Sequence, residues 1–139
     1  MAIFSNNRIV SVVDDDADIS LLFCDALSSI NGLCVCEFTD PIKALEHLKL
    51  HSNDYVIAIS DLRMPVINGA QLLKTVRDLN PYTRTILMTA FDLDDRLLHE
   101  YVQNKIINRF LQKPIGLDGL VNEVDRQLHY FEMQKSIPS

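Results

Sequence analysis

Short apolar runs alternate with amphipathic segments along the whole chain. The first run, residues 9–13, is rich in β-branched side chains and is followed at once by three aspartates, which is typical of a buried strand that ends at a polar edge. The next segment carries apolar residues at three- and four-residue spacing, which predicts an amphipathic helix that stops at Asn31-Gly32. The apolar stripe of this helix consists of Ile19, Leu22, Phe23, Ala26, Leu27 and Ile30.

The same unit of strand and helix recurs to the end of the chain. Further strands are predicted at residues 33–38, 55–60, 83–88 and 106–111. Further helices are predicted from Asp40-Pro41, from Asn68-Gly69, from about 93 to 103 and from about 117 to 133. Strands this uniformly apolar have no face in water, and strands that alternate with helices form parallel sheets covered on both sides. We therefore expect an α/β fold, namely a three-layer, doubly wound domain of five strands and five helices.

Polar residues follow the predicted strands at the positions where a parallel sheet builds its sites. Asp14 and Asp15 follow the first strand, and Asp61 follows the third. Thr89 and Lys113 follow the fourth and fifth strands. Because ligands bind outside the carboxyl ends of the strands in doubly wound sheets, we expect these side chains to line one site.

This set of side chains suits phosphate chemistry. Two carboxylates in close contact repel each other by roughly 4 kcal/mol at an effective dielectric constant of about 20, so a cation is needed to offset the repulsion. Mg²⁺ prefers carboxylate oxygens and keeps waters that a phosphate oxygen can replace. The Lys113 ammonium and the Thr89 hydroxyl suit an oxyanion. Asp61, alone at its strand end, is the best candidate for a nucleophile that forms an acyl phosphate, and Asp14 and Asp15 are candidates for the metal ligands.

Part of the acidic run has a simpler interpretation. Residues 14–18 contain four aspartates in five positions, and such a run often caps a helix and complements its dipole. Asp16 and Asp18 are the members that best fit this role. The four histidines lie on predicted helices or at their ends without metal spacing, which favours solvated positions.

Composition limits the class of protein. The 139 residues suit one globular domain, with 47% hydrophobic and 23% charged residues. A net charge of −6 disfavours direct binding to nucleic acid or to an anionic membrane. Cys24, Cys34 and Cys36 show no zinc spacing and are predicted to be small buried hydrophobic residues. Since the chain shows neither a signal peptide nor a membrane span, we expect a cytoplasmic protein.

The chain resembles the receiver domain of two-component response regulators, with a chemotaxis-regulator-like pattern, from Arg8 to about His129. Four motifs carry the resemblance, and each stands at the end of a predicted strand. They are Val12-Val13-Asp14-Asp15-Asp16, Asp61-Leu62-Arg63-Met64-Pro65 with Asn68-Gly69, Met88-Thr89-Ala90, and Phe110-Leu111-Gln112-Lys113-Pro114. The resemblance implies a flavodoxin-like sheet in the order 2-1-3-4-5. It also implies a single receiver domain over residues 1–139, with a core at about 8–129 and a C-terminal helix extension and tail at 130–139.

The resemblance further implies a phosphorelay function and a role for each residue. Asp61 would accept a phosphoryl group from a sensor histidine kinase or a phosphotransfer protein. Asp14, Asp15, Asp61 and the backbone carbonyl of Arg63 would hold Mg²⁺. Lys113 would pair with the phosphoryl oxygens, and Thr89 would move to hydrogen-bond one of them. Phe110 would then turn inward and change the face formed by the fourth helix, the fifth strand and the fifth helix.

That face would control a downstream protein or an output domain, and the resemblance allows a phosphorylation-dependent dimer. Such a domain is a signalling module that catalyses only its own phosphorylation and dephosphorylation. Arg63 and Phe91 would flank the path of the hydrolytic water, and bulky Phe91 is expected to slow loss of the phosphoryl group. Ile106-Ile107 replace the small pair that the family usually carries before the fifth strand.

Two other classes of function remain open from the sequence. The first is a Mg²⁺-dependent phosphohydrolase of the haloacid-dehalogenase type, since Asp14 and Asp16 form a DxD motif at a strand end. Against this class, Asp18 stands where that family prefers Thr or Val, and Asp61 has no role. The second is a pseudo-receiver, an interaction module with the fold but without phosphorylation. Uptake of one phosphoryl group per chain, without turnover, separates the receiver from both.

Overall fold

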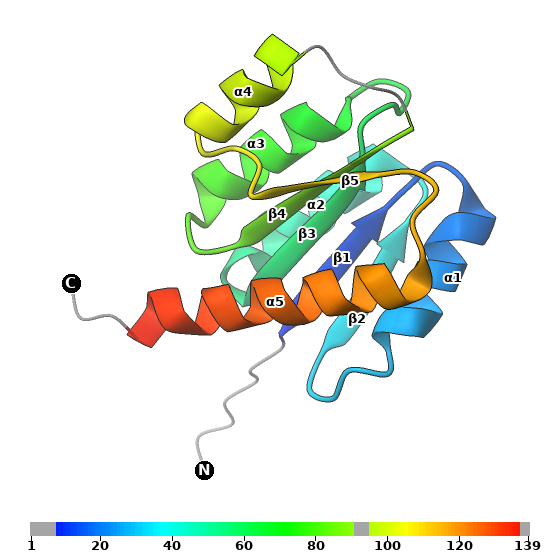
Figure 1. Cartoon of the computed structure of the whole chain (residues 1–139), viewed down its shortest axis with the longest axis vertical. Helices are drawn as coiled ribbons and strands as arrows, with labels where there is room; N and C mark the ends of the chain where they lie inside the picture. Colours follow the sequence, from blue (N-terminus) through cyan, green and yellow to red (C-terminus); the bar gives the residue numbers. More distant parts are fainter. Residues whose placement is uncertain (1–7, 91–94, 137–139) are drawn as a thin grey trace.

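The computed structural model describes residues 8–90 and 95–136, and it has three layers with a parallel sheet in the middle (Figure 1). The strands are β1 (Ile9–Val13), β2 (Cys34–Phe38), β3 (Tyr55–Asp61), β4 (Arg84–Thr89) and β5 (Arg109–Gln112). The helices are α1 (Ala17–Leu27), α2 (Pro41–His51), α3 (Gly69–Leu79), α4 (Asp95–Gln103) and α5 (Leu117–Ser136), with a short 3₁₀ turn η1 (Ser52–Asp54) before β3. None of the helices in these described ranges is both long and apolar enough to cross a membrane.

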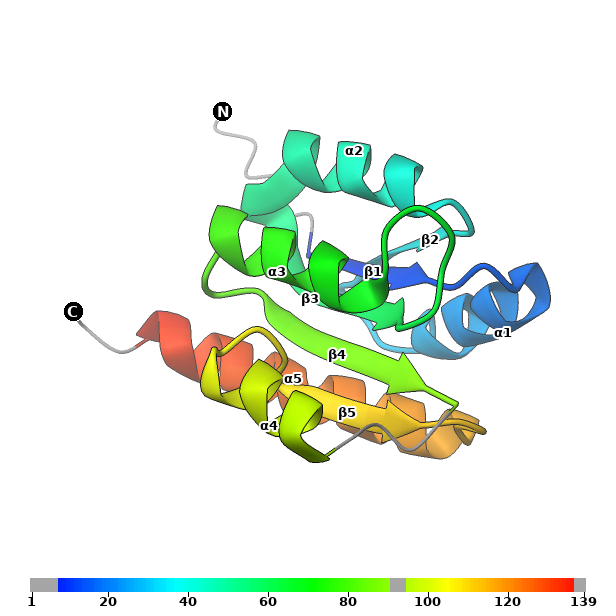
Figure 2. The same cartoon turned by 90° about the horizontal axis from the view of Figure 1, so that it is seen from above.

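All strand pairs are parallel, and the strand order is β2-β1-β3-β4-β5. The two faces of the sheet carry different helices (Figure 2). On one face, α1 and α5 pack through Phe23 and Leu128 against strand residues such as Val12. On the other face, α2 and α3 pack through Leu48 and Leu73. The predicted three-layer doubly wound fold and its strand order are confirmed.

Three helices begin where the sequence predicts, each with a side chain that caps the first turn. The Asp16 carboxylate accepts hydrogen bonds from the amides of Asp18 and Ile19 and thereby caps α1. Asp40 caps α2 in front of Pro41, and the Asn68 side chain caps α3 by accepting a hydrogen bond from the amide of Gln71. Because such caps satisfy amides that have no partner within the helix, they fix where the connection from each strand ends.

The last strand is shorter than predicted. Residues 106–111 were expected to form it, but β5 spans Arg109–Gln112. Lys105 has a φ of 58°, and the amides of Ile106 and Ile107 bond to the carbonyl of Tyr101. Ile106 and Ile107 therefore form a turn, and Ile107 is buried in the core with only 2% of its surface exposed. Apolar content alone could not distinguish such a turn from a strand.

Asn108 holds this turn against the neighbouring strand. Its Oδ1 accepts hydrogen bonds from the amide of Thr85 at 2.8 Å and from the Thr85 hydroxyl at 3.2 Å. We expect Asn108→Ala to lower the free energy of unfolding by about 1–3 kcal/mol, because the amide of a buried residue loses its acceptor. Urea unfolding measures this change. Asn108→Asp keeps an acceptor and should lose less, and equal losses in both variants would contradict this role.

Several side chains differ from the prediction in how far they are buried. Cys34 is exposed and Cys36 is half-buried on the edge strand β2, and Cys24 is half-buried on α1, so the prediction of buried cysteines is wrong. Leu22 belongs to the predicted apolar stripe of α1 but is 50% exposed. His47, predicted to be solvated, is half-buried, and its Nδ1 lies 2.6 Å from the Tyr55 hydroxyl.

Candidate functional site

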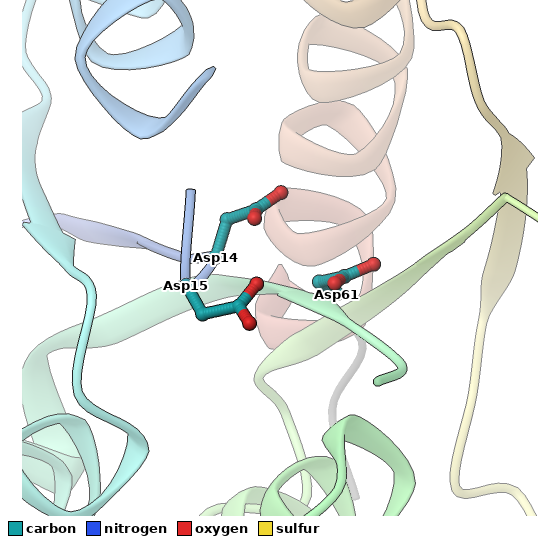
Figure 3. Close-up of side chains that lie close together, drawn as sticks. All are labelled: Asp14, Asp15 and Asp61. Carbon is teal, nitrogen blue, oxygen red and sulfur yellow. The ribbon is translucent and has the colours of Figure 1, made fainter. Parts of the chain in front are cut away.

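Three carboxylates meet at the carboxyl edge of the sheet. Asp14 and Asp15 follow β1, and Asp61 is the last residue of the adjacent strand β3. One oxygen from each of the three lies within 4.8 Å of the others, and the side chains gather at the same edge in Figure 3. Asp14 and Asp61 are buried, whereas Asp15 is exposed. Mg²⁺ takes hard oxygen ligands from proteins, so carboxylates are donors of the type that this ion requires.

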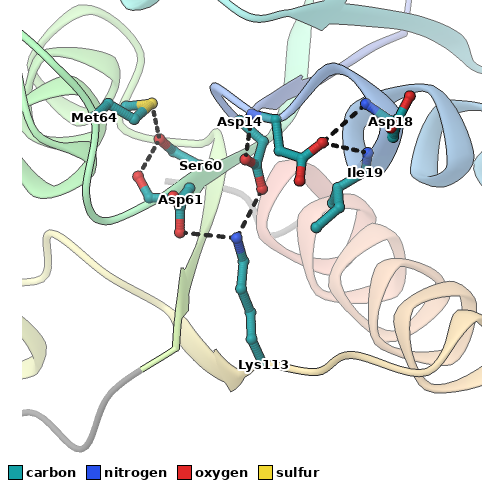
Figure 4. Close-up of polar contacts among 8 residues, drawn as sticks. Asp14, Asp18, Ile19, Ser60, Asp61, Met64 and Lys113 are labelled. Carbon is teal, nitrogen blue, oxygen red and sulfur yellow. Dashed lines mark hydrogen bonds and ion pairs between the residues drawn. The ribbon is translucent and has the colours of Figure 1, made fainter.

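Lys113 bridges two of these carboxylates. Its Nζ lies 2.9 Å from Asp14 Oδ2 and 3.2 Å from Asp61 Oδ1, as the dashed lines in Figure 4 show. The other Asp14 oxygen accepts a hydrogen bond from the amide of Asp16 at 2.9 Å. The lysine side chain is only 18% exposed, so the ammonium and the carboxylates interact largely out of water.

Burial and charge shift the ionisation of this cluster. Burial raises the pKa of Asp61 and the Asp14 carboxylate raises it further, while the Lys113 ammonium opposes both. For Lys113, burial lowers the pKa, but the Asp14 and Asp61 carboxylates outweigh this effect and the pKa ends above its usual value. Because the folded protein holds the Asp61 proton more tightly than the unfolded chain does, ionisation of Asp61 costs folding free energy. A bound cation would recover that cost.

The other predicted site residues differ in their positions and in their exposures. Thr89 ends β4 and is 7% exposed, and its carbonyl accepts a hydrogen bond from the amide of Lys113 at 2.7 Å. Arg63 is exposed in the loop after β3. Phe110 lies on β5, half-buried, and packs against the core cluster that contains Leu87. Phe91 lies outside the described residues.

A shallow cleft of about 560 Å³ opens beside the carboxylates. It is lined by Asp15, Leu62, Arg63, Met64, Pro65, Asn68 and Tyr101. The cleft therefore joins the exposed carboxylate of the site to the loop between β3 and α3.

Gly69 packs closely against the backbone of Asp61, a contact that the sequence pattern did not reveal. The sequence predicts a helix start at Asn68-Gly69 and places this pair in the Asp61 motif, and Asn68 does form a capping box with Gln71. The α-carbon of Gly69 also lies so close to β3 that a Cβ there would come within 2.1 Å of the Asp61 carbonyl oxygen. In addition, the Ser60 hydroxyl donates a hydrogen bond to that carbonyl at 3.0 Å. The backbone of Asp61 is thus held from two sides.

Val66 occupies a strained position in the same loop. It has a φ of 72° and is 88% exposed, and the amide of Ile67 bonds to the carbonyl of Pro65 across it in a three-residue turn. This conformation costs a β-branched residue about 1 kcal/mol of folding free energy. We expect Val66→Asn to raise the free energy of unfolding by about 0.5–1 kcal/mol, because asparagine tolerates positive φ. Val66→Thr, which keeps the branch, should leave urea unfolding unchanged, and an equal gain in both variants would refute the strain.

The fold and the site together define an α/β domain that brings acidic and lysine side chains to the carboxyl edge of its sheet. The response regulator receiver domain family matches residues 10–125, and the chain belongs to this family. The expected resemblance is therefore confirmed. Receiver domains are signalling modules of two-component systems, and they generally bind Mg²⁺ at their acidic pocket.

Relatives agree with this assignment, and a solved structure agrees with the fold. The DNA-binding transcriptional regulator NtrC of Escherichia coli (strain K12) is 35% identical over 128 residues, which cover 91% of this chain and 26% of NtrC. The chain thus spans about a quarter of that relative's length. Chemotaxis protein CheY of Bacillus subtilis (strain 168) is 24% identical over 86% of this chain and 97% of CheY. A receiver domain protein from Clostridium thermocellum, 18% identical, shares the fold with a TM-score of 0.79 over 91% of this chain and 98% of its own.

Proposed function

We propose that this domain receives a phosphoryl group on Asp61 from a phosphohistidine of a sensor kinase or a phosphotransfer protein. The Asp61 carboxylate oxygen attacks phosphorus, the bond between phosphorus and the imidazole nitrogen breaks, and the neutral imidazole leaves after it takes up a proton. The observation that carries the proposal is the position of Asp61 beside both a second carboxylate and the Lys113 ammonium, 3.2 Å away. Lys113 would neutralise charge on the transferred group, which is the main requirement of phosphoryl transfer.

Asp14, Asp15, Asp61 and the carbonyl of Arg63 would hold Mg²⁺ in this reaction. Their oxygens are the donor type that this ion requires, and the three carboxylates already meet within 4.8 Å. When bound, the ion supplies positive charge that offsets the carboxylate repulsion and the developing charge of the phosphoryl oxygens. Asp14 also orients Lys113 through the contact at 2.9 Å.

Thr89 and Phe110 would carry the signal away from the site. Thr89 ends the strand next to Asp61, and its hydroxyl would bond a phosphoryl oxygen after transfer. Phe110 pairs with Leu87 on that strand and is half-buried, so it would follow Thr89 inward and alter the face formed by α4, β5 and α5. A phosphoryl group adds about −1.5 to −2 charges, which is enough to bias two states a few kcal/mol apart. This face would act on a downstream protein or an output domain.

The phosphohydrolase alternative finds no support in the structure. It requires Asp16 as a partner of Asp14 in chemistry, but the Asp16 carboxylate caps α1 and lies in exposed surroundings. It also leaves the buried Asp61 and its lysine contact without a role. Since the family is that of receiver domains, a single phosphoryl transfer to the chain is the better proposal.

Labelling with acetyl phosphate tests the proposal without knowledge of the kinase. In the presence of Mg²⁺ we expect uptake to stop at one phosphoryl group per chain, and removal of Mg²⁺ by a chelator should suppress it. Continuous release of phosphate with many turnovers would support a hydrolase instead. Absence of any uptake at saturating donor and Mg²⁺ would support a pseudo-receiver.

A further inference from the structure

A pair of thiols lies on β2, the edge strand of the sheet, and takes no part in the acidic site. Cys34 and Cys36 are two residues apart on β2, so their side chains leave the same face of the strand. Their sulfur atoms are 3.9 Å apart, and Cys34 is exposed to solvent. Because β2 is an edge strand, a solute can reach this pair from the side of the sheet.

Two imidazoles lie on the helix that covers the same face. Cys36 packs into the core cluster that contains Leu48 and Tyr55, which places it on the α2 side of the sheet. On α2, the ring centroids of His47 and His51 are 4.5 Å apart with the rings tilted by 42°, and the His47 ring lies 5.2 Å from that of Phe38, the β2 residue two positions after Cys36.

The strand register brings the end of α2 to the level of Cys34. Ile9 pairs with Cys34 on one side and with Tyr55 on the other, so these three residues form a row across the sheet. His51 ends α2 only four residues before Tyr55, and it is exposed. The last turn of α2 therefore lies toward the end of the sheet at which β1 and β3 begin, and Cys34, the first residue of β2, belongs to that same end.

We propose that Cys34 and Cys36 form a binding site for one thiophilic metal ion of the zinc and cadmium class, with the exposed imidazole of His51 as a further ligand. Thiolate and imidazole are the ligands that such ions select over the oxygen ligands preferred by Mg²⁺. The site is thus chemically distinct from the carboxylates of the phosphoryl site.

The distance between the sulfurs favours an ion over a disulfide. A tetrahedral ion with metal–sulfur bonds of about 2.3 Å holds two sulfurs about 3.8 Å apart, which matches the 3.9 Å observed. A disulfide needs about 2.05 Å, and two α-carbons on one strand at this spacing, about 6.7 Å apart, lie at the upper end of the range that a disulfide spans. An ion can therefore bind both sulfurs without movement of β2.

The third ligand requires a side-chain rotation. Among the described residues, the carboxylates of Asp14, Asp15 and Asp61 form the one group of three such ligands already within 4.8 Å of one another. His51 must therefore turn toward the sulfurs on binding, and an exposed side chain at the end of a helix has the freedom to do so. The thiols alone would contribute most of the affinity.

Titration with Cd²⁺ tests the site directly. The fully reduced protein is titrated in the absence of oxygen and with excess Mg²⁺ to fill the carboxylate site, and the ultraviolet charge-transfer band of cadmium thiolate is recorded. We expect one Cd²⁺ per chain and a rise in the midpoint of thermal unfolding. Cys34→Ser and Cys36→Ser should each weaken binding by at least about 100-fold, and His51→Ala by about tenfold.

Cys24 provides the matched control, because it lies on α1, the helix that covers the opposite face of the sheet. Cys24→Ser should keep the band, the stoichiometry and the thermal shift. The proposal is overturned if Cys34→Ser binds Cd²⁺ like the wild type, if Cys24→Ser loses the band, or if each ion requires two chains.

Discussion

Asp61→Asn is expected to reduce phosphoryl uptake from acetyl phosphate to background. Asparagine has the shape of aspartate but offers no carboxylate oxygen that can attack phosphorus, so the acyl phosphate cannot form. The substitution should not unfold the domain, since it removes one of three carboxylates that repel one another within 4.8 Å. Labelling with radioactive donor and a circular dichroism spectrum of the same sample measure both effects.

Asp16→Asn is the matched control for this substitution. Asp16 stands in the same acidic run, but its carboxylate caps α1, and asparagine caps a helix about as well. Labelling of Asp16→Asn should equal that of the wild type. If Asp61→Asn takes up phosphoryl groups at the wild-type level while Asp16→Asn stays unlabelled, Asp61 is not the phosphoryl acceptor.

Among substitutions that add a single methyl group at this site, Gly69→Ala is expected to lower the free energy of unfolding the most. The added Cβ would lie 2.1 Å from the Asp61 carbonyl oxygen and 2.9 Å from a methyl carbon of Leu87. Backbone atoms cannot yield as a flexible side chain does, so we expect a loss of about 3 kcal/mol in the free energy of unfolding. Since the displaced backbone carries the acceptor, phosphoryl uptake by the folded protein should also slow.

Gly119→Ala separates this steric effect from the general effect of the substitution. Gly119 lies in α5, and a Cβ there meets nothing within 4 Å. Alanine is the better helix former by about 1 kcal/mol, so this variant should be as stable as the wild type or more stable. Urea unfolding of both variants is the measurement, and a comparable loss at the two positions would contradict the close approach at Gly69.

The acidic edge was predictable because it follows from local pattern and one topological rule. Apolar runs that stop at aspartates indicate strand ends, and the carboxyl ends of parallel strands share one edge. The sequence therefore identified Asp14, Asp61 and Lys113 before their distances were known. The three helix starts were predictable for the same reason, since a cap depends on residues within one turn.

Features that depend on contacts between distant segments were not predictable. The approach of Gly69 to Asp61 is a packing contact between a helix start and a strand end, and Asn-Gly indicates only a turn. The start of β5 depends on the bond between Asn108 and Thr85, 23 residues earlier in the chain. The exposure of Cys34 follows from the position of β2 at the sheet edge, which the family resemblance implies through the strand order but the apolar pattern of the strand does not show.

The central claim is that Asp61 carries the phosphoryl group, and mapping of the modified residue tests it most directly. Borohydride reduces an acyl phosphate to an alcohol, so aspartyl phosphate becomes homoserine and can be located by peptide mass spectrometry. After incubation with acetyl phosphate and Mg²⁺, we predict homoserine at position 61 and unchanged aspartate at positions 14, 15 and 16. Homoserine at position 14 or 15 with intact Asp61, or a stable phosphoryl group on another residue type, would contradict the proposed function.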